Sequence, residues 1–367
     1  MDEIKAKRYS NLKYSLSILD TFYLLLILFI FSGFGTAKIL VSALAHLGLP
    51  RYLILPLYFL ILSVSYYLLS FPINLCRTYI AERQFSLSNQ KINDWLLDQL
   101  KGCILGYILG LVLISAFYFI LRVFPGYWWV VISIFWILFS VVIAKLTPIL
   151  IIPLFFKYKK LEDELLRSRI IKLAENMRIK ILDVFEIDLS KKSLKANAAF
   201  VGVGGTKRVL LADTLKDKYG HDEVEVILAH EFAHYKLKHI LKLIFLNSII
   251  TFLAFYIIFK TSGSVLKLFG LTSLSDYASL PVVFIYFILF SIITQPLEAL
   301  ISRIFEKEAD TLALKTTRAR EAFISTMDKL AVQNLADRNP HPLIKFYFFD
   351  HPPIDERIGM AKNAKLD

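Results

Sequence analysis

His230-Glu231-Phe232-Ala233-His234 is the stretch that decides the fold of this chain. It has the form His-Glu-x-x-His and lies in a segment whose composition favours a helix. Residues four apart lie on one face of a helix, so both imidazoles can bind one metal ion. Glu231 is then near enough to act as a base on a water beside that ion. The alternative is a solvated polar helix turn with two histidines, but two ligands and a base within so short a stretch favour the metal site.

The rest of the composition places this motif in a membrane protein. Hydrophobic residues make up 56% of the 367 residues, and the mean hydropathy is +0.56, which is too apolar for a soluble chain of this length. The apolar residues form runs long enough to span a bilayer as helices. The six runs are about Ser15–Phe34, Tyr52–Cys76, Cys103–Leu121, Trp128–Thr147, Leu241–Lys260 and Leu280–Ile301. We therefore expect a mainly α, multi-pass membrane protein with these spans.

The net charge of +12 could indicate nucleic-acid binding, but its distribution indicates membrane topology instead. Lys and Arg gather before the first span, between the second and third spans, and from Lys157 to His239, whereas the connections on the other side hold few. Basic residues concentrate on the cytoplasmic side of membrane proteins. We therefore expect a lipid bilayer and no nucleic acid as partner, with both termini and the metal motif on the cytoplasmic side. In a prokaryote this membrane would be the plasma membrane.

An acidic segment supplies the third ligand that a catalytic zinc site needs. Residues 306–310 (EKEAD) begin where the sixth span leaves the membrane, on the same side as the histidine motif. Glu306 and Asp310 share a helical face, so Glu306 can bind the metal while Asp310 accepts the free N–H of a ligating imidazole. Glu308 is the rival ligand, and an ordinary charged helix turn is the other reading. His239, five residues after the motif, is expected to be a surface or interfacial histidine.

Further stretches occur with these motifs in a recognisable order. Asn-Ala-Ala-Phe at 197–200 precedes the histidine motif, and Asp-His-Pro-Pro at 350–353, with Glu356 and Arg357, follows the acidic segment. This order resembles the type I CAAX prenyl proteases, which are membrane-integrated zinc metallopeptidases. The resemblance extends over nearly the whole chain and includes the loop around residues 82–90. Eukaryotic members have seven spans, so the six here lack one, which corresponds to the first.

The resemblance implies one Zn²⁺ ion bound by His230, His234 and Glu306. Zinc lowers the pKa of a bound water toward neutrality. Glu231 would be the general base that takes the proton of this water and passes it to the leaving amine of the cleaved peptide.

The resemblance also implies roles for residues around the metal. Asp310 would hold a ligand histidine, and Arg357 would brace the site. Asn197 would hold the substrate backbone beside the cleft, and His351 would face the tetrahedral intermediate. For Asn197 the alternative is an ordinary turn or edge-strand asparagine, and for His351 it is a turn histidine before two prolines.

The chain divides into four parts that form a helical bundle with a cytoplasmic-side, zincin-like α+β catalytic domain. Residues 1–156 are a four-span membrane region, whose loop at 82–101 predicts an interfacial helix because its apolar residues share one face. Residues 157–225 are the soluble part of the catalytic domain. Residues 226–301 hold the motif helix, which continues into the fifth span, and then the sixth; 302–367 complete the domain. Within the soluble part we expect a helix at 161–178, strands at 181–187, 197–202 and 207–211, and a turn at Gly204-Gly205.

These features predict an integral membrane zinc metalloendopeptidase that cuts peptides or proteins at or within the membrane boundary. The resemblance implies lipidated C-terminal CAAX peptides as substrates, and damaged membrane proteins are the other class considered. One alternative is a quality-control protease for membrane proteins without prenyl specificity. Another is a transporter or scaffold with a structural zinc site. A structural site normally has four protein ligands and no spare base, so Glu231 favours catalysis.

Overall fold

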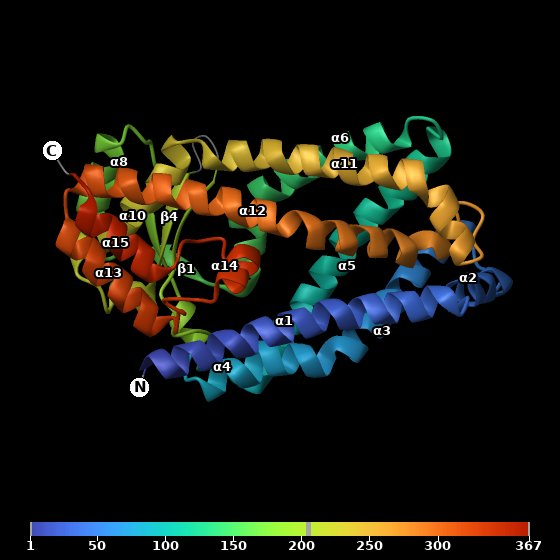
Figure 1. Ribbon diagram of the computed structural model, residues 1–367, viewed down its shortest axis with the longest axis horizontal. Helices are drawn as coiled ribbons and strands as arrows, with labels where there is room; N and C mark the ends of the chain where they lie inside the picture. Colours follow the sequence, from blue (N-terminus) through green and yellow to red (C-terminus); the bar gives the residue numbers. More distant parts are fainter. Residues whose placement is uncertain (1, 203–206, 366–367) are drawn as a thin grey trace.

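The computed structural model describes residues 2–202 and 207–365. Long helices run along one direction of the molecule, and a small sheet with several shorter helices lies at one end of them (Figure 1). Both ends of the chain lie at this same end, as an even number of membrane crossings requires. The expected class, a mainly helical multi-pass membrane protein with a small α+β domain, is confirmed.

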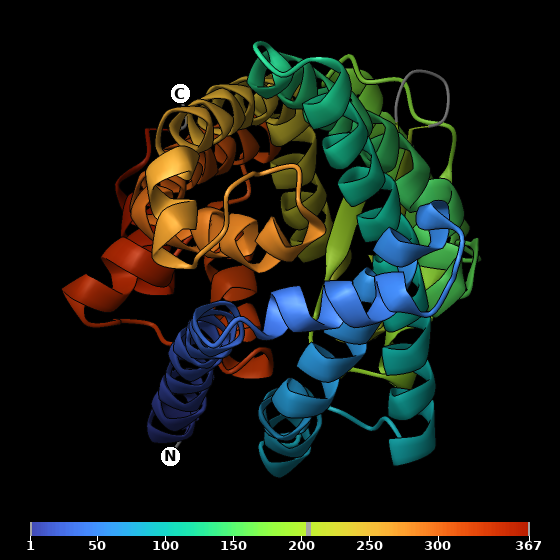
Figure 2. The same cartoon turned by 90° about the vertical axis from the view of Figure 1, so that its right-hand side faces the viewer.

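Six helical segments of the described residues are long and apolar enough to cross a bilayer, as the apolar runs predicted. They are α1 (Asp2–Gly33), α3 (Arg51–Leu75) continued by a π-turn (Cys76–Ile80) and α4 (Ala81–Gln84), α5 (Ile92–Val123), α6 (Trp128–Leu146) continued by a π-turn (Thr147–Ile151) and α7 (Ile152–Phe155), α11 (His239–Leu268) and α12 (Leu280–Thr317). The short helix α2 (Thr36–His46) connects α1 to α3 at the end away from the sheet (Figure 2). Large apolar side chains face outward, with Leu138 61% and Ile293 74% exposed, and so much apolar surface is stable only against lipid.

The sheet has four strands in the order β1-β2-β4-β3. They are β1 (Tyr158–Lys160), β2 (Val184–Ile187), β3 (Ala198–Val201) and β4 (Arg208–Ala212). β2 and β4 are parallel, with Val184 opposite Val209, and the two outer pairs are antiparallel. The three predicted strands are confirmed: β2 and β3 are shorter than predicted, and β4 is shifted by one residue. β1 was not predicted, because three residues are too few to show an alternating pattern. The turn expected at Gly204-Gly205 lies outside the described residues.

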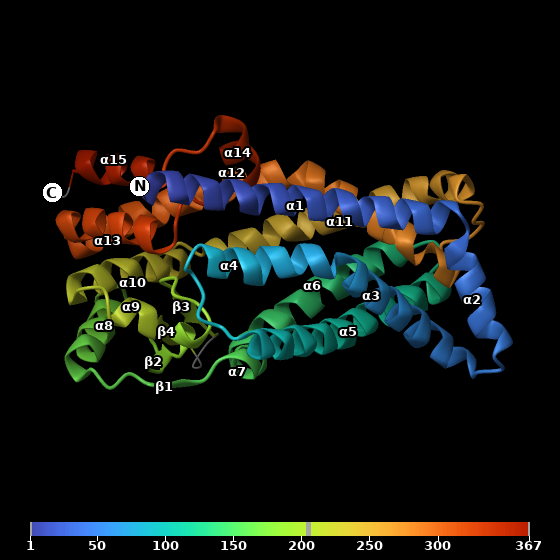
Figure 3. The same cartoon turned by 90° about the horizontal axis from the view of Figure 1, so that it is seen from below.

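Shorter helices surround this sheet. They are α8 (Glu164–Asn176), α9 (Asp213–Lys216), α10 (His221–Lys236), α13 (Arg320–Gln333), α14 (Pro342–Phe348) and α15 (Ile354–Asn363), with 3-10 turns at Leu189–Lys191 and Tyr277–Ser279. α10 lies between the sheet and α13 (Figure 3). Its apolar face, with Leu228 and Phe232 fully buried, joins Val184 and Val209 in one core. The helix that carries the histidine motif is therefore held on both sides.

α10 and α11 are separate helices, whereas the sequence predicted one helix from the motif into the fifth span. The helix is interrupted at Leu237 and Lys238, and Lys238 has a φ of 59°. A residue in the left-handed region ends a right-handed helix and redirects the chain. The break brings His239, the first residue of α11, back toward the end of α10. No glycine or proline marks the break in the sequence, which is why it was not predicted.

The helix at the start of the third span also differs from prediction. α5 runs without interruption from Ile92 to Val123, so the predicted interfacial helix within 82–101 is the first turns of the membrane helix itself. Its apolar face is only partly covered. Trp95 is buried and donates its indole N–H to the Thr78 hydroxyl at 3.1 Å, whereas Leu100 is 57% exposed.

Candidate metal centre and catalytic cleft

Two closely packed helices bring the candidate metal ligands together. α12 has 38 residues, or about 57 Å at the usual helical rise, so it extends well beyond a hydrocarbon layer of about 30 Å. Its last turns pack against α10 through Ala229 and Ala233 on one side and Ala309 and Ala313 on the other, all 0% exposed. Such small side chains allow two helix backbones to approach closely. Glu306 therefore comes to lie beside the histidine motif.

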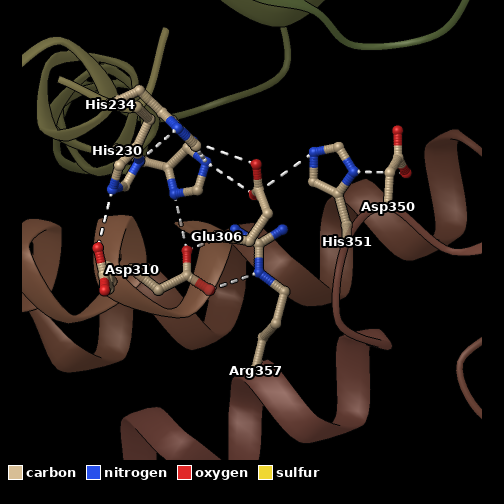
Figure 4. Close-up of polar contacts among 9 residues, drawn as sticks. His230, His234, Glu306, Asp310, Asp350, His351 and Arg357 are labelled. Carbon is tan, nitrogen blue, oxygen red and sulfur yellow. Dashed lines mark hydrogen bonds and ion pairs between the residues drawn. The ribbon is translucent and has the colours of Figure 1, made fainter. Parts of the chain in front are cut away.

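The three predicted ligands converge on one point (Figure 4). One ligand atom each from His230, His234 and Glu306 lies within 4.8 Å of the others. His234 Nε2 is 3.1 Å from His230 Nε2 and 3.2 Å from Glu306 Oε1. Glu306 Oε2 is 3.2 Å from His230 Nε2.

This donor set fits a zinc ion. Two imidazoles and one carboxylate are a usual ligand set for catalytic zinc and leave one position open. Glu306 Oε2 is buried and makes no hydrogen bond with the residues described. An orphaned carboxylate oxygen is costly in a protein interior, and a bound cation would remove that cost.

A buried ion pair holds His230 from behind. Its Nδ1 lies 2.8 Å from Asp310, which is 0% exposed. Arg357 donates to both oxygens of Asp310, at 2.7 and 2.5 Å. Burial alone would lower the pKa of His230, but the carboxylates of Asp310 and Glu306 raise that pKa to about 9 without a metal. The contact expected between Asp310 and a candidate ligand histidine is therefore present, and Arg357 pairs with the same carboxylate.

A second series of polar side-chain contacts holds His234, and the sequence analysis did not predict it. His239 Nδ1 lies 3.0 Å from His234 Nδ1, and His239 Nε2 lies 2.9 Å from Glu308. His239 is only 1% exposed and stacks on Phe305 at 4.4 Å between ring centres. Of the predicted surface or interfacial position, the surface position is wrong, because the prediction assumed an unbroken helix. Glu308, the rival ligand, contacts His239 rather than the point where the three ligands meet.

A cleft of about 460 Å³ opens beside the ligands, lined among others by Asn197, Glu231 and His351. Glu231 is partly exposed to it, and burial of the carboxyl group raises its pKa. His351 is half exposed, with its Nε2 3.4 Å from Glu306 Oε2. Its Nδ1 lies 2.8 Å from Asp350. Burial would lower the pKa of His351, but the carboxylates of Asp350 and Glu306 raise it.

Every candidate residue thus lies at the cleft or directly behind it. Asn197 is exposed at the start of β3, and its backbone carbonyl accepts the N–H of Ala212 at 3.1 Å. Two contributing residues were not assigned a role from the sequence, His239 and Asp350. Asp350 could have been found, since an acidic neighbour of a candidate histidine suggests a hydrogen-bonded pair.

Comparisons with known proteins agree with this architecture. Residues 160–365 match the model of peptidase family M48. Residues 3–157 match the CAAX prenyl protease N-terminal region, described as five membrane helices, whereas the described part of that range holds four helices long and apolar enough to cross a bilayer.

Individual relatives extend the similarity over most of the chain. The CAAX prenyl protease 1 homolog of Arabidopsis thaliana is 32% identical over 297 residues, which is 78% of this chain and 68% of that protein. The uncharacterized metalloprotease YhfN of Bacillus subtilis is 28% identical over 291 residues, with the same coverages of 78% and 68%. The crystal structure of S. mikatae Ste24p has the same fold, with a TM-score of 0.89 at 24% identity over 99% of this chain and 89% of that one. The chain belongs to peptidase family M48, and its N-terminal region is of the CAAX prenyl protease type.

Proposed function

We propose that this protein is an integral membrane zinc metalloendopeptidase that hydrolyses peptide bonds at the membrane boundary. The observation that carries the proposal is the arrangement at the cleft. Three ligand atoms gather around one point, and a further acidic side chain, Glu231, opens onto the cleft beside them. A structural zinc site normally has four protein ligands and no such base, which argues against a transporter or scaffold.

The chemistry follows from the side chains that face the cleft. Zinc held by the three ligands would polarise the peptide carbonyl and make a bound water acidic. Glu231 would take a proton from that water and later give it to the leaving amine, a role suited to a carboxyl group with a raised pKa. His351, oriented by Asp350, would donate a hydrogen bond to the oxyanion that forms on the carbonyl.

The edge strand beside the cleft would hold the substrate. β3 is the outer strand of the sheet on the cleft side, and Asn197 and Ala198 line the cleft. An extended peptide can add to such an edge through main-chain hydrogen bonds. The Asn197 side chain would then contact the substrate backbone, next to the bond that is cut.

Two further cavities support a lipidated substrate. A cavity of about 620 Å³ between α1, α12 and α14 shares Phe348 with the catalytic cleft. A mainly apolar cavity of about 360 Å³ lies between α1, α3 and α12. It shares Leu24, Phe287 and Ile288 with the cavity of about 620 Å³. A hydrocarbon chain gains about 0.8 kcal/mol for each buried CH₂ group. We therefore favour lipidated C-terminal CAAX peptides, in keeping with the names of the relatives, over unlipidated membrane proteins.

The catalytic side is proposed to be cytoplasmic. The sheet domain lies at the same end as both chain termini (Figure 1), and the basic residues of the sequence concentrate at that end. Basic residues close to membrane helices are retained on the cytoplasmic side.

The test is cleavage by the detergent-solubilised protein, with zinc content measured in parallel. We expect the wild type to hold about one zinc ion and to cut. Glu231→Gln, which leaves all three ligands in place, should keep the zinc and lose cleavage. A farnesylated CAAX peptide and the same peptide without its lipid are compared as substrates. Equal rates on both would favour a general membrane protease, and a zinc-loaded wild type that cuts neither peptide would point to a structural zinc site.

A further inference from the structure

The segment that leads into β3, residues 192–197, is held by the membrane region. It has no regular secondary structure, yet it forms one wall of the cleft through Ala196 and Asn197. Leu194 donates its backbone N–H to the carbonyl of Leu87 at 2.9 Å. The hydroxyl of Ser88 donates to the carbonyl of Lys192 at 2.6 Å. Leu87 and Ser88 belong to the loop between the second and third spans, more than a hundred residues earlier in the chain.

The opposite side of the same segment is held by the catalytic domain. Gln333 donates to the carbonyl of Leu194 at 2.7 Å. Asn334 accepts the backbone N–H of Ala196 at 2.9 Å. The Thr214 hydroxyl donates to the carbonyl of Lys195 at 2.8 Å. An irregular segment becomes rigid when its backbone groups are bonded in this way, so the position of β3 depends on both parts of the molecule.

A charged cluster around Glu82 also joins the membrane region to the segment at 192–197. The Glu82 carboxylate accepts hydrogen bonds from the Tyr9 hydroxyl at 2.6 Å and from Lys13 at 2.9 Å. Lys195 lies 2.9 Å from the second oxygen of Glu82 and also donates to the Tyr9 hydroxyl at 2.8 Å. The Glu82 side chain is only 13% exposed. One carboxylate thus joins α1, α4 and a lysine two residues before Asn197.

From these contacts we infer that Glu82 is a positioning residue for peptide binding. It holds Lys195, and with the loop at 87–88 it sets where β3 begins relative to Glu231. The membrane region is then part of the substrate site as well as an anchor. Glu82 does not touch the metal ligands, so it acts on substrate binding rather than on the chemical step. The inference rests on the proposed function, because it assumes that β3 binds the substrate.

The test compares Glu82→Gln with Glu186→Gln, a matched control. Glu186 is similarly buried, with 12% of its side chain exposed, and pairs with Lys216 at 2.8 Å. It lies on β2, which β4 separates from β3. KM and kcat are measured on the farnesylated CAAX peptide. The Kd of a fluorescent form of that peptide is measured in a Glu231→Gln background, together with zinc content. We expect Glu82→Gln to raise KM and Kd by about tenfold, with kcat within about twofold and zinc unchanged, and Glu186→Gln to change none of these.

Ser88→Ala is a milder second variant that removes no charge; it removes the hydrogen bond to the Lys192 carbonyl and the one that Ser88 accepts from the Gln90 backbone N–H. It should shift KM in the same direction by less. Lys195→Met should act through the same contact, so the double variant with Glu82→Gln should bind no more weakly than the worse single variant. If the wild type cleaves the peptide and Glu82→Gln keeps its KM and Kd, or loses only kcat or zinc, the positioning role is overturned. If the wild type does not cleave, it is the proposed function that has failed.

Discussion

Replacing His239 by phenylalanine should weaken zinc binding by about 10- to 100-fold, the usual effect of losing the partner of a metal-ligating histidine. His239 Nδ1 lies 3.0 Å from His234 Nδ1, and His239 Nε2 lies 2.9 Å from Glu308. With zinc on His234 Nε2, the His234 Nδ1–H would donate to His239, and the His239 Nε2–H to Glu308. A phenyl ring would keep the stacking on Phe305, whose plane lies only 9° from that of His239. It would leave the His234 Nδ1–H without this acceptor in a partly buried place, at a cost of about 1–3 kcal/mol, which is consistent with the expected loss of affinity.

The affinity is measured by competition between the metal-free protein and a fluorescent zinc chelator. His239→Asn keeps an acceptor near the position of Nδ1 and should lose less affinity than the phenylalanine variant. Glu308→Gln should change the affinity by less than about threefold, because Glu308 is 45% exposed and its pairing is weakened by solvent. A phenylalanine variant that unfolds at the wild-type temperature and binds zinc as tightly as wild type would refute the proposed support of His234.

Two other perturbations test the opposite side of the metal site. Asp310→Asn should destabilise the protein by about 3–5 kcal/mol, because it leaves the buried Arg357 charge unpaired. The control is Glu164→Gln, a substitution at an exposed site. Equal thermal unfolding midpoints for the two variants would contradict this prediction. Zinc binding at pH 7–8 should release about one proton from His230, since its pKa of about 9 keeps it protonated below that pH in the metal-free protein. Zinc also acidifies its bound water, which releases a proton of its own. Titration calorimetry in buffers of different ionisation enthalpy should therefore show the His230 contribution disappear as the pH rises above about 9, leaving only the proton of the bound water. A total release that does not fall between about pH 8 and pH values above about 9 would show that His230 starts neutral.

The sequence was sufficient wherever the information is local. Membrane spans follow from runs of apolar residues, because the cost of burying charge in a bilayer acts on each segment separately. The histidine pair and the pair Glu306 and Asp310 follow from helical spacing alone.

The tertiary structure decided the features that depend on one backbone angle or on distant contacts. The positive φ of Lys238 turned His239 from a predicted surface residue into the partner of His234. No residue type near position 238 predicts that angle. The strained backbone conformation is stabilised by tertiary contacts elsewhere in the fold. The three residues of β1 are likewise a strand only because β2 lies beside them.

The membrane region shows most clearly the difference between what the sequence predicts and what the tertiary structure decides. The sequence by itself predicted that residues 82–90 lie in the connection between the second and third spans, and the family resemblance included this stretch, but neither could assign it a task. Its contacts with residues 192–197 join segments about a hundred residues apart. Such pairings leave no periodic trace in either segment, because hydrogen bonds between irregular backbone stretches depend on how the whole chain packs. Only the folded molecule therefore connects Glu82 to the strand beside Glu231.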